Sequence, residues 1–207
     1  MSNHYYSKNP ETESAPVYWD FQLKGRSFRF KTDRGVFSKK EVDYGSRLLI
    51  EAFQLEQNGL VLDVGCGYGP IGISLAKSFP ETTVHMVDVN ERALGLAREN
   101  AILNQVDNVK IYESDRLTQV EETQFQAILT NPPIRAGKKV VHEIFEQSAG
   151  HLADTGELWV VIQKKQGAPS AIEKLETLFG QVDVVEKKKG YFIIRARAKK
   201  VDSRMGL

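Results

Sequence analysis

The chain has 207 residues and a net charge of +1; 41% of its residues are hydrophobic and 27% are charged, as in globular rather than disordered or fibrous proteins. This length favours one main domain, and its apolar runs stay well short of the roughly 20 residues that cross a bilayer. The N-terminus lacks the apolar segment of a signal peptide, so we expect a cytoplasmic protein with no membrane partner. Cys66 is the only cysteine and the four histidines are scattered, which excludes an internal disulfide and predicts no metal site.

The low net charge conceals two basic segments. Between positions 24 and 40 there are seven basic residues and one acid, and from position 187 to the C-terminus there are eight and one. The rest of the chain has 13 basic and 25 acidic residues. If the two segments share a face, they favour phosphate binding. Lysines and arginines that protect exposed strand edges from aggregation explain them equally well.

The first 42 residues do not show a βα repeat, and we predict an N-terminal extension over 1–42 followed by the main domain over 43–207. Residues 21–30 alternate apolar and polar side chains around Gly25, which predicts a basic hairpin. Asp43 and Ser46 are N-cap residue types, and they predict a helix that ends near Gly59.

From Gly59 onward short apolar runs alternate with amphipathic ones, which is the pattern of βαβ units. We predict strands at 60–64, 83–89, 109–112, 125–130, 158–162, 182–186 and 191–198, and helices at 70–78, 90–104, 140–152 and 169–179. The connection over 187–190 is too short for a crossover helix, so the last two strands must pair antiparallel. The prediction is an α/β fold: a mostly parallel, seven-stranded sheet closed by a C-terminal antiparallel hairpin, with helices on both faces.

A glycine loop that runs from Asp63 to Gly69 links the first strand of this repeat to the first helix. In open α/β sheets, ligands bind beyond the carboxyl ends of the strands where the strand order reverses. Gly65, Gly67 and Gly69 allow positive φ and a close approach of the backbone, and Asp63 adds a carboxylate. A dinucleotide loop reads G-x-G-x-x-G, whereas this loop reads G-x-G-x-G after an acid, which suits a cofactor with a cationic amino-acid part. A tight structural turn is the alternative.

Two further acids end the next strands. Asp88 is placed to accept hydrogen bonds from both ribose hydroxyls of an adenosine group, although the cap of the following helix is an alternative role. Asp115 is placed to accept from the adenine amino group, and an ordinary loop aspartate is nearly as good an explanation.

Asn131-Pro132-Pro133 follows the fourth strand. The prolines fix an extended turn and remove amide donors, so the Asn131 side-chain oxygen and the Pro132 carbonyl remain as acceptors close together. Two fixed acceptors suit an NH2 group, because they stabilise the positive charge that develops on its nitrogen during alkylation. A rigid turn is the alternative. We take these three residues as the catalytic group, and count Asn131 among the cofactor-binding residues as well.

Basic residues follow this turn at Arg135, Lys138 and Lys139. They are placed to hold a phosphate of the substrate beside the reacting group, because contacts of this kind fix the register of a nucleic acid. Solvation of the surface is the competing explanation.

Together, the Asp63 to Gly69 loop, Asp88 and Asn131-Pro-Pro-Ile134 resemble the class I S-adenosylmethionine-dependent methyltransferases, within the small-domain group that contains the bacterial small-subunit ribosomal RNA guanine-N2 methyltransferases. Gly35 to Ser38 and Asp43 to Ser46 resemble the lead-in of that group, and the resemblance covers about 28–207. It implies that Asp63 and the three glycines surround the methionine part of the cofactor, with Asp88 at the ribose and Asp115 at the adenine.

The same resemblance implies ribosomal RNA or the small ribosomal subunit as partner, and a guanine amine received by Asn131 and Pro132. Two departures concern the substrate. Ile134 stands where the group commonly has an aromatic residue that stacks on the base, and Phe37 or Tyr44 is the candidate substitute. The longer ribosomal enzymes also carry an additional N-terminal domain, in place of which this chain has its basic hairpin.

Other functions remain compatible with these residues. An adenine N6 amine or a protein glutamine amide presents a similar planar NH2 group. A noncatalytic RNA-binding assembly factor would keep the cofactor fold without turnover. A nicotinamide oxidoreductase is disfavoured by the spacing of the glycines.

Overall fold

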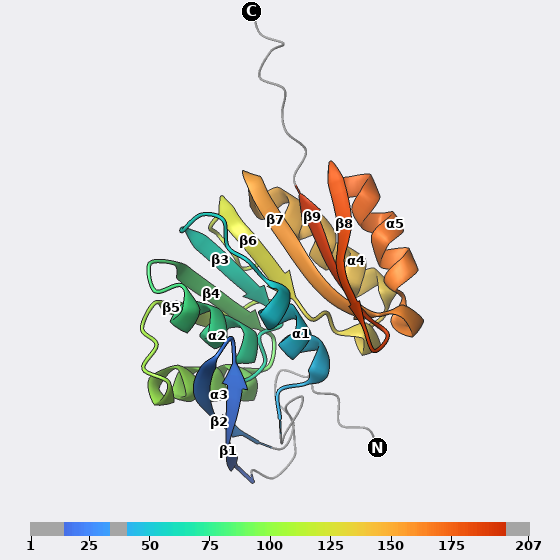
Figure 1. Cartoon of the computed structure of the whole chain (residues 1–207). Coiled ribbons are helices and arrows are strands. Elements are labelled where there is room, and N and C mark those ends of the chain that lie inside the picture. The colour runs from blue at the N-terminus through green and yellow to red at the C-terminus, as the bar shows by residue number, and fades with distance from the viewer. Residues whose placement is uncertain (1–14, 34–40, 198–207) are drawn as a thin grey trace, which may run out of the picture.

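The computed structural model describes residues 15–33 and 41–197 (Figure 1). The strands are β1 (Val17–Leu23), β2 (Arg26–Thr32), β3 (Leu60–Val64), β4 (Thr83–Asp88), β5 (Val109–Glu113), β6 (Phe125–Thr130), β7 (Leu152–Gln163), β8 (Gln181–Lys188) and β9 (Tyr191–Arg197). The helices are α1 (Tyr44–Ala52), α2 (Pro70–Ser78), α3 (Glu91–Leu103), α4 (Lys138–His151) and α5 (Ala168–Leu178), with short 3-10 turns η1 (Ile134–Ala136) and η2 (Lys164–Gln166). No helix in these two ranges is long and apolar enough to cross a membrane.

The main sheet has seven strands in the order β5-β4-β3-β6-β7-β9-β8. Strands β3 to β7 are parallel, and β9 pairs antiparallel with both β7 and β8. This is the Rossmann-like methyltransferase fold, so the predicted fold class is confirmed. The basic hairpin predicted around Gly25 is also present, as the pair β1 and β2.

Strand β7 is longer than the prediction of 158–162, because it begins at Leu152, directly after α4. Its pairing with β6 shifts register between Phe125 and Ala127. A Cβ atom on Gly156 would lie 2.6 Å from the Phe125 carbonyl oxygen, so glycine permits the close approach of the two strands. The extension contains the exposed, turn-type residues Asp154 and Thr155, so its sequence pattern resembles a loop rather than a strand.

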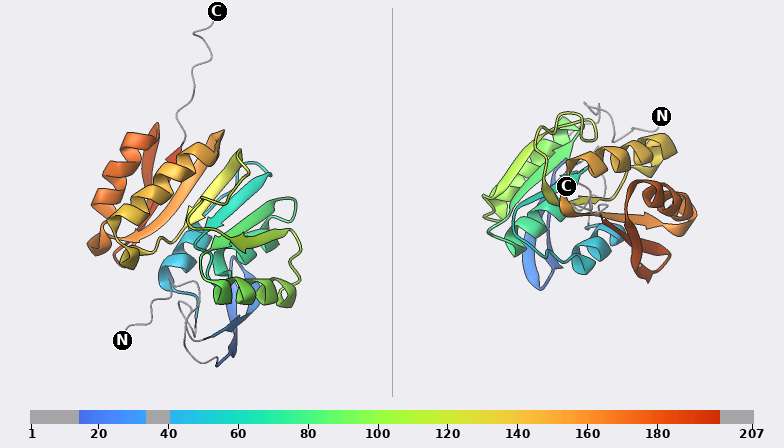
Figure 2. Two further views of the ribbon diagram at one scale, coloured as in Figure 1. Left: turned by 180° about the vertical axis from the view of Figure 1, so that it is seen from behind. Right: turned by 90° about the horizontal axis from the view of Figure 1, so that it is seen from above.

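Two apolar clusters cover the two faces of the sheet. One contains Val61, Leu129 and Trp159 from the strands and packs against α1, α2 and α3. The other contains Leu62 and Ile128 and packs against α4 and α5, which lie together in front of the sheet when the molecule is seen from behind (Figure 2). Because successive strand residues point to opposite faces, burial of both faces explains the unbroken apolar runs in the sequence.

The β1–β2 hairpin is attached to α3 by two buried asparagines. The Asn100 side chain exchanges hydrogen bonds of 2.7 and 2.9 Å with the backbone of Lys31, and Asn104 does the same with Arg29 at 3.0 and 2.8 Å. Near the hairpin tip, the Lys24 amino group donates to the Phe53 carbonyl at the end of α1. These contacts hold Lys31 and Arg29 through their backbone and Lys24 through its charged amino group.

Candidate active site

The two motifs singled out in the sequence leave the sheet side by side. Strands β3 and β6 are neighbours although β4 and β5 separate them in the chain, so the strand order reverses between them. Val64 is paired with Thr130, and the Thr130 hydroxyl donates to the Val64 carbonyl at 3.0 Å. The next residues, Gly65 and Asn131, therefore emerge together at the carboxyl edge, where open α/β sheets bind their ligands.

The glycine loop keeps open space in front of its backbone. Gly65 and Gly67 have φ values of +75° and +57°, and a Cβ atom on either would meet no heavy atom within 4 Å. Gly69 differs, because a Cβ there would lie 2.7 Å from Ile73 and 2.9 Å from Met86. Gly69 thus allows the start of α2 to pack on the sheet, while the other two glycines border an open cradle. Contact of any of the three with a cofactor stays a prediction.

Asp63 lies beneath this loop and is fully buried. Its Oδ2 atom accepts a hydrogen bond of 2.9 Å from the Gly72 amide, whereas its buried Oδ1 atom has no partner among the described residues. Burial raises the pKa of Asp63 to about 7; the charge of Asp88 adds to the rise and the Gly72 bond opposes it. A carboxyl group in this state gains most from a cationic ligand group.

Asp88, at the end of β4, holds the glycine loop in place. Its Oδ2 atom accepts from the Gly67 amide and its Oδ1 atom from the Asn90 amide, both at 2.9 Å. Burial raises the pKa of Asp88, and these two bonds oppose the rise. Asn90 itself caps α3 by accepting from Ala93, so Asp88 is not the cap residue. Each carboxylate oxygen can accept more than one hydrogen bond, which leaves capacity for hydroxyl donors.

Asp115 lies beyond the end of β5 and is exposed. Its side chain pairs with Arg116 at 2.7 Å, and Arg116 also contacts Glu143 of α4. A hydrogen bond joins Gly67 to Asp88, and the charge of Asp88 acts on Asp63, but no contact among the described residues joins the Asp115 side chain to these groups. Its role at an adenine stays a prediction.

Asn131 is held in one orientation by the start of α1. Its side-chain Nδ2 donates to the Ser46 hydroxyl at 3.0 Å and approaches both carboxylate oxygens of Asp43 at 3.3 Å. A carboxylate only accepts hydrogen bonds, so the amide must turn its NH2 group toward Asp43. The Asn131 Oδ1 atom then faces away and receives no donor from the described residues. The helix cap and the site therefore share one carboxylate, since Asp43 also accepts from Gly45 and Ser46 amides at 2.9 and 3.2 Å.

The sequence predicted Asp43 and Ser46 only as caps of α1, and their contact with Asn131 was missed. The signal that pointed to it was their place in the lead-in segment of the family resemblance. Pro132 is buried, and the Pro133 carbonyl accepts from the Ala136 amide at 2.9 Å, so the turn after Asn131 is continued directly by η1.

Three of the predicted substrate-binding residues, Ile134, Arg135 and Lys138, follow this turn in the chain. Ile134 is half-buried and packs against the second apolar cluster, while Arg135 and Lys138 are exposed. Phe37 lies outside the described residues. Tyr44, the alternative aromatic, follows Asp43 directly, and its ring centre is 5.5 Å from that of Tyr191. Tyr191 was not a candidate in the sequence, because its strand gave no sign that it begins beside α1.

The fold and this edge together define a class of protein. The family model of the methyltransferase small domain matches residues 27–195. The chain therefore belongs to the small-domain family of S-adenosylmethionine-dependent methyltransferases, and the resemblance found in the sequence is confirmed.

The relatives of this chain differ in how well their functions are characterised. An uncharacterized protein from Bacillus subtilis, YbxB, is 63% identical over 95% of this chain and 99% of its own length. The ribosomal RNA small subunit methyltransferase C of Hamiltonella defensa is 31% identical over 85% of this chain and 52% of its own length. Among solved structures, the 16S rRNA N2 methyltransferase RsmC of T. thermophilus, in complex with AdoMet and guanosine, has a TM-score of 0.81 and 25% identity over 92% of this chain and 52% of that one. The chain thus spans about half the length of these methyltransferase C relatives.

Proposed function

We propose that this protein uses S-adenosylmethionine to methylate an exocyclic amine of a base in RNA, namely guanine N2 of small-subunit ribosomal RNA. The observation that carries the proposal is the orientation of Asn131, whose Nδ2 is bound by Asp43 and Ser46 so that Oδ1 is presented as an acceptor. An acceptor fixed beside a glycine cradle suits an amine that must be brought to a cofactor.

The residues at the edge fit this cofactor. The Oδ1 of Asp63, which has no partner among the described residues, suits the ammonium of its methionine part, and the open space at Gly65 and Gly67 suits a group that lies against the backbone. Asp88 and Asp115 would hold the ribose and the adenine. When bound, the cofactor supplies an electrophilic methyl group.

Asn131 and Pro132 act on the nitrogen that receives the methyl group. Asn131 Oδ1 and the Pro132 carbonyl accept hydrogen bonds from the two protons of the target amine, which favours a localised lone pair on nitrogen. As that nitrogen becomes positively charged, acceptors already in place stabilise the transition state more than the ground state. The alkylated nitrogen is acidic and releases its proton to solvent, so no strong base is required.

The substrate is inferred from the relatives together with the basic residues near the site. Arg135 and Lys138 follow the catalytic turn and would contact phosphate. Ile134 stands where the family commonly has an aromatic residue that stacks on the base. Tyr44 would stack on the base instead, and Phe37 is the other candidate for this role. We also retain the division into an extension over 1–42 and a methyltransferase domain over 43–207 as part of the proposal.

The decisive experiment is nucleoside mass spectrometry of ribosomal RNA from cells with and without the gene. The expected result is loss of one N2-methylguanosine from small-subunit RNA, restored by the wild-type gene but not by an Asn131→Ala copy. Transfer of labelled methyl groups to adenine N6 or to protein instead would identify one of the alternative targets. Cofactor binding without methyl transfer to any ribosomal component would favour a noncatalytic assembly factor.

The anchor of Asn131 gives a smaller, separate prediction. Ser46→Ala removes the shortest contact of the Asn131 amide, and one neutral hydrogen bond is worth about 0.5–1.5 kcal/mol. We expect kcat for RNA methylation to fall several-fold, up to about tenfold, with cofactor affinity unchanged and with activity restored in Ser46→Thr. Ser78→Ala is the matched control, because the Ser78 hydroxyl donates to the Ser74 carbonyl of the same helix at 2.7 Å and has no other partner in the described part of the chain. Equal kcat for wild type and Ser46→Ala would contradict the positioning role.

A further inference from the structure

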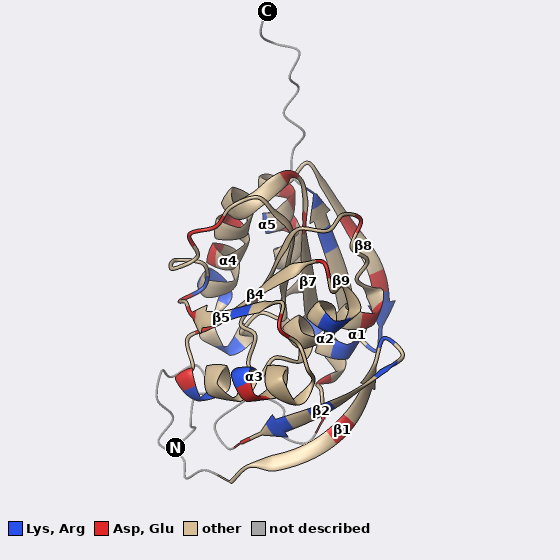
Figure 3. Cartoon of the chain, turned by 90° about the vertical axis from the view of Figure 1, so that its left-hand side faces the viewer, with Lys and Arg blue, Asp and Glu red and all other residues tan. Residues whose placement is uncertain are grey.

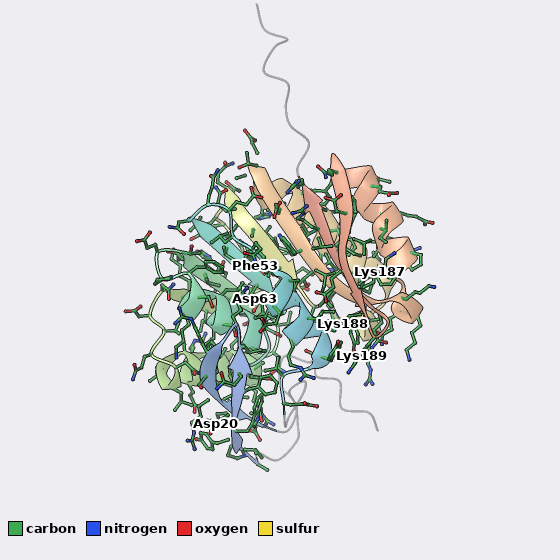
Figure 4. The ribbon with its side chains drawn as sticks, viewed as in Figure 1. Asp20, Phe53, Asp63, Lys187, Lys188 and Lys189 are labelled. Carbon is green, nitrogen blue, oxygen red and sulfur yellow. The ribbon has the colours of Figure 1, made fainter. Side chains whose placement is uncertain are left out.

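The turn between β8 and β9 lies at the same edge of the sheet as Asn131. Because β9 runs antiparallel to β7, its first residue, Tyr191, is paired with Gln163 at the carboxyl end of β7. The Lys164 amide also donates to the Gly190 carbonyl at 2.8 Å, which ties the turn to η2. Lys187 and Lys188 end β8, and Lys189 begins the turn to β9; we name these three residues the lysine turn, and Figure 4 labels all three.

Contacts through α1 connect the lysine turn to the catalytic asparagine. The Lys189 amino group lies 5.1 Å from the centre of the Tyr44 ring, and the Tyr44 and Tyr191 rings are 5.5 Å apart. A Cβ atom on Gly45 would lie 2.9 Å from the Tyr191 ring, so the start of α1 packs tightly on the turn. Asp43, which directly precedes Tyr44, accepts a hydrogen bond of 3.3 Å from the Asn131 side chain. The start of α1 therefore connects the lysine turn to Asn131.

The charges of the lysine turn are not neutralised within the described part of the chain. All three lysines are exposed, and none pairs with a described carboxylate. Lys187 instead lies over the Phe192 ring, at 4.9 Å from its centre. By contrast, Lys31 of the hairpin bonds to Glu99 at 2.6 Å, and Lys110 bonds to Glu122 at 3.2 Å.

The two edges of the sheet differ in charge. After β6 and β7 the chain places exposed basic residues at the carboxyl edge: Arg135, Lys138, Lys139, Lys164 and Lys165. Before strands β3 to β6, and at the start of β7, it places acids at the opposite edge: Glu56, Glu81, Asp107, Glu121, Glu122 and Asp154. Figure 3 shows the basic β8–β9 turn close to α1. The positive half of the carboxyl edge is thus the half that begins at Asn131 and ends at the lysine turn.

We propose that the lysine turn is a phosphate-binding surface that holds the RNA strand flanking the target base. This inference rests on the proposed function. It adds the path by which the RNA strand reaches the site, which crosses the ends of β7 and β9 and passes over Tyr44 and Tyr191. A polyanion is attracted to closely spaced cations without carboxylate partners, and a base that leaves its stack can be received on an aromatic ring. The Tyr44–Tyr191 pair lies between the phosphate contacts and Asn131.

The test compares binding of a 16S ribosomal RNA transcript over a series of salt concentrations. When Lys187, Lys188 and Lys189 are all changed to alanine, we expect the affinity for this RNA to fall by roughly tenfold or more. The slope of log K against log salt should also fall by about 1 for each phosphate group that the variant no longer binds. The effect should appear mainly in KM for RNA. A variant with three arginines at these positions should keep the slope, because it keeps the charges.

The matched control changes Arg26, Lys77 and Lys110 to alanine, which removes the same charge away from this edge, and it should bind RNA as wild type does. Calorimetry with S-adenosylhomocysteine verifies that each variant keeps its cofactor site. Wild-type RNA affinity and salt slope in the lysine-turn variant would overturn the inference while the proposed function stands; if that variant only aggregates, the lysines protect the exposed edge of β8, and the inference is equally wrong. Absence of both binding and methylation of RNA by the wild-type protein would instead overturn the proposed function, and this inference with it.

Discussion

Replacing Asn131 with alanine is expected to lower the turnover of RNA methylation by roughly 10²- to 10³-fold, the effect of removing one preorganised hydrogen bond to a developing charge. The structure explains why the decrease should be large. Asp43 and Ser46 fix the amide in advance, so its oxygen needs no reorganisation when the nitrogen becomes positive. Initial rates with saturating cofactor and RNA measure the effect.

Asn58→Ala is the control for this experiment, because Asn58 lies at the opposite edge and bonds to Glu81 at 2.8 Å. It should retain wild-type turnover. Circular dichroism and thermal unfolding verify that the Asn131 variant is folded, which matters because its partner Asp43 also caps α1. If the folded Asn131→Ala protein methylates RNA at the wild-type rate, the proposed mechanism is wrong.

The second large effect is expected at Asp63. A charge-assisted hydrogen bond is worth about 1.5–3 kcal/mol, so Asp63→Asn should weaken S-adenosylhomocysteine binding by roughly 10- to 100-fold at pH 8. The wild-type affinity should depend on pH, because the pKa of this buried carboxyl is raised to about 7 and a cationic ligand favours its ionised form. Affinity should rise between about pH 5 and pH 7 and level off above that. Calorimetry in two buffers at pH 6 should detect a released proton.

The same carboxyl predicts the pH dependence of stability in the ligand-free protein. With a folded-state pKa of about 7 and an unfolded value of about 3.9, the folded state binds the proton more tightly. The free energy of unfolding should therefore decrease as pH rises from about 4 to about 7. Urea unfolding of the Asp63→Asn variant should lack this pH-dependent component.

The affinity prediction has its own contrary outcome. If the affinity of the wild-type protein for S-adenosylhomocysteine is independent of pH and no proton is released on binding, Asp63 does not meet the cationic group.

Most of the fold was predictable because its signals are local. The alternation of short apolar runs with amphipathic segments predicted the strands and helices, and the short connection before Tyr191 required an antiparallel end to the sheet. The start of β7 was missed, since Asp154, Thr155 and Gly156 are turn-type residues and the first two are exposed, so the local pattern favoured a loop before Leu158.

The candidate site also combines features that follow from local sequence with features that depend on the tertiary structure. The sequence by itself determined that Asp63 lies near the end of a strand and that the glycines and Asn131 follow strands, because residue types and spacing are properties of the chain. Only the tertiary structure decided that β3 and β6 are neighbours, that Asp43 turns the Asn131 amide, and that the lysine turn lies beside Tyr44. These contacts join residues far apart in the chain. They depend on strand order and helix packing, which the whole core fixes and no local pattern contains.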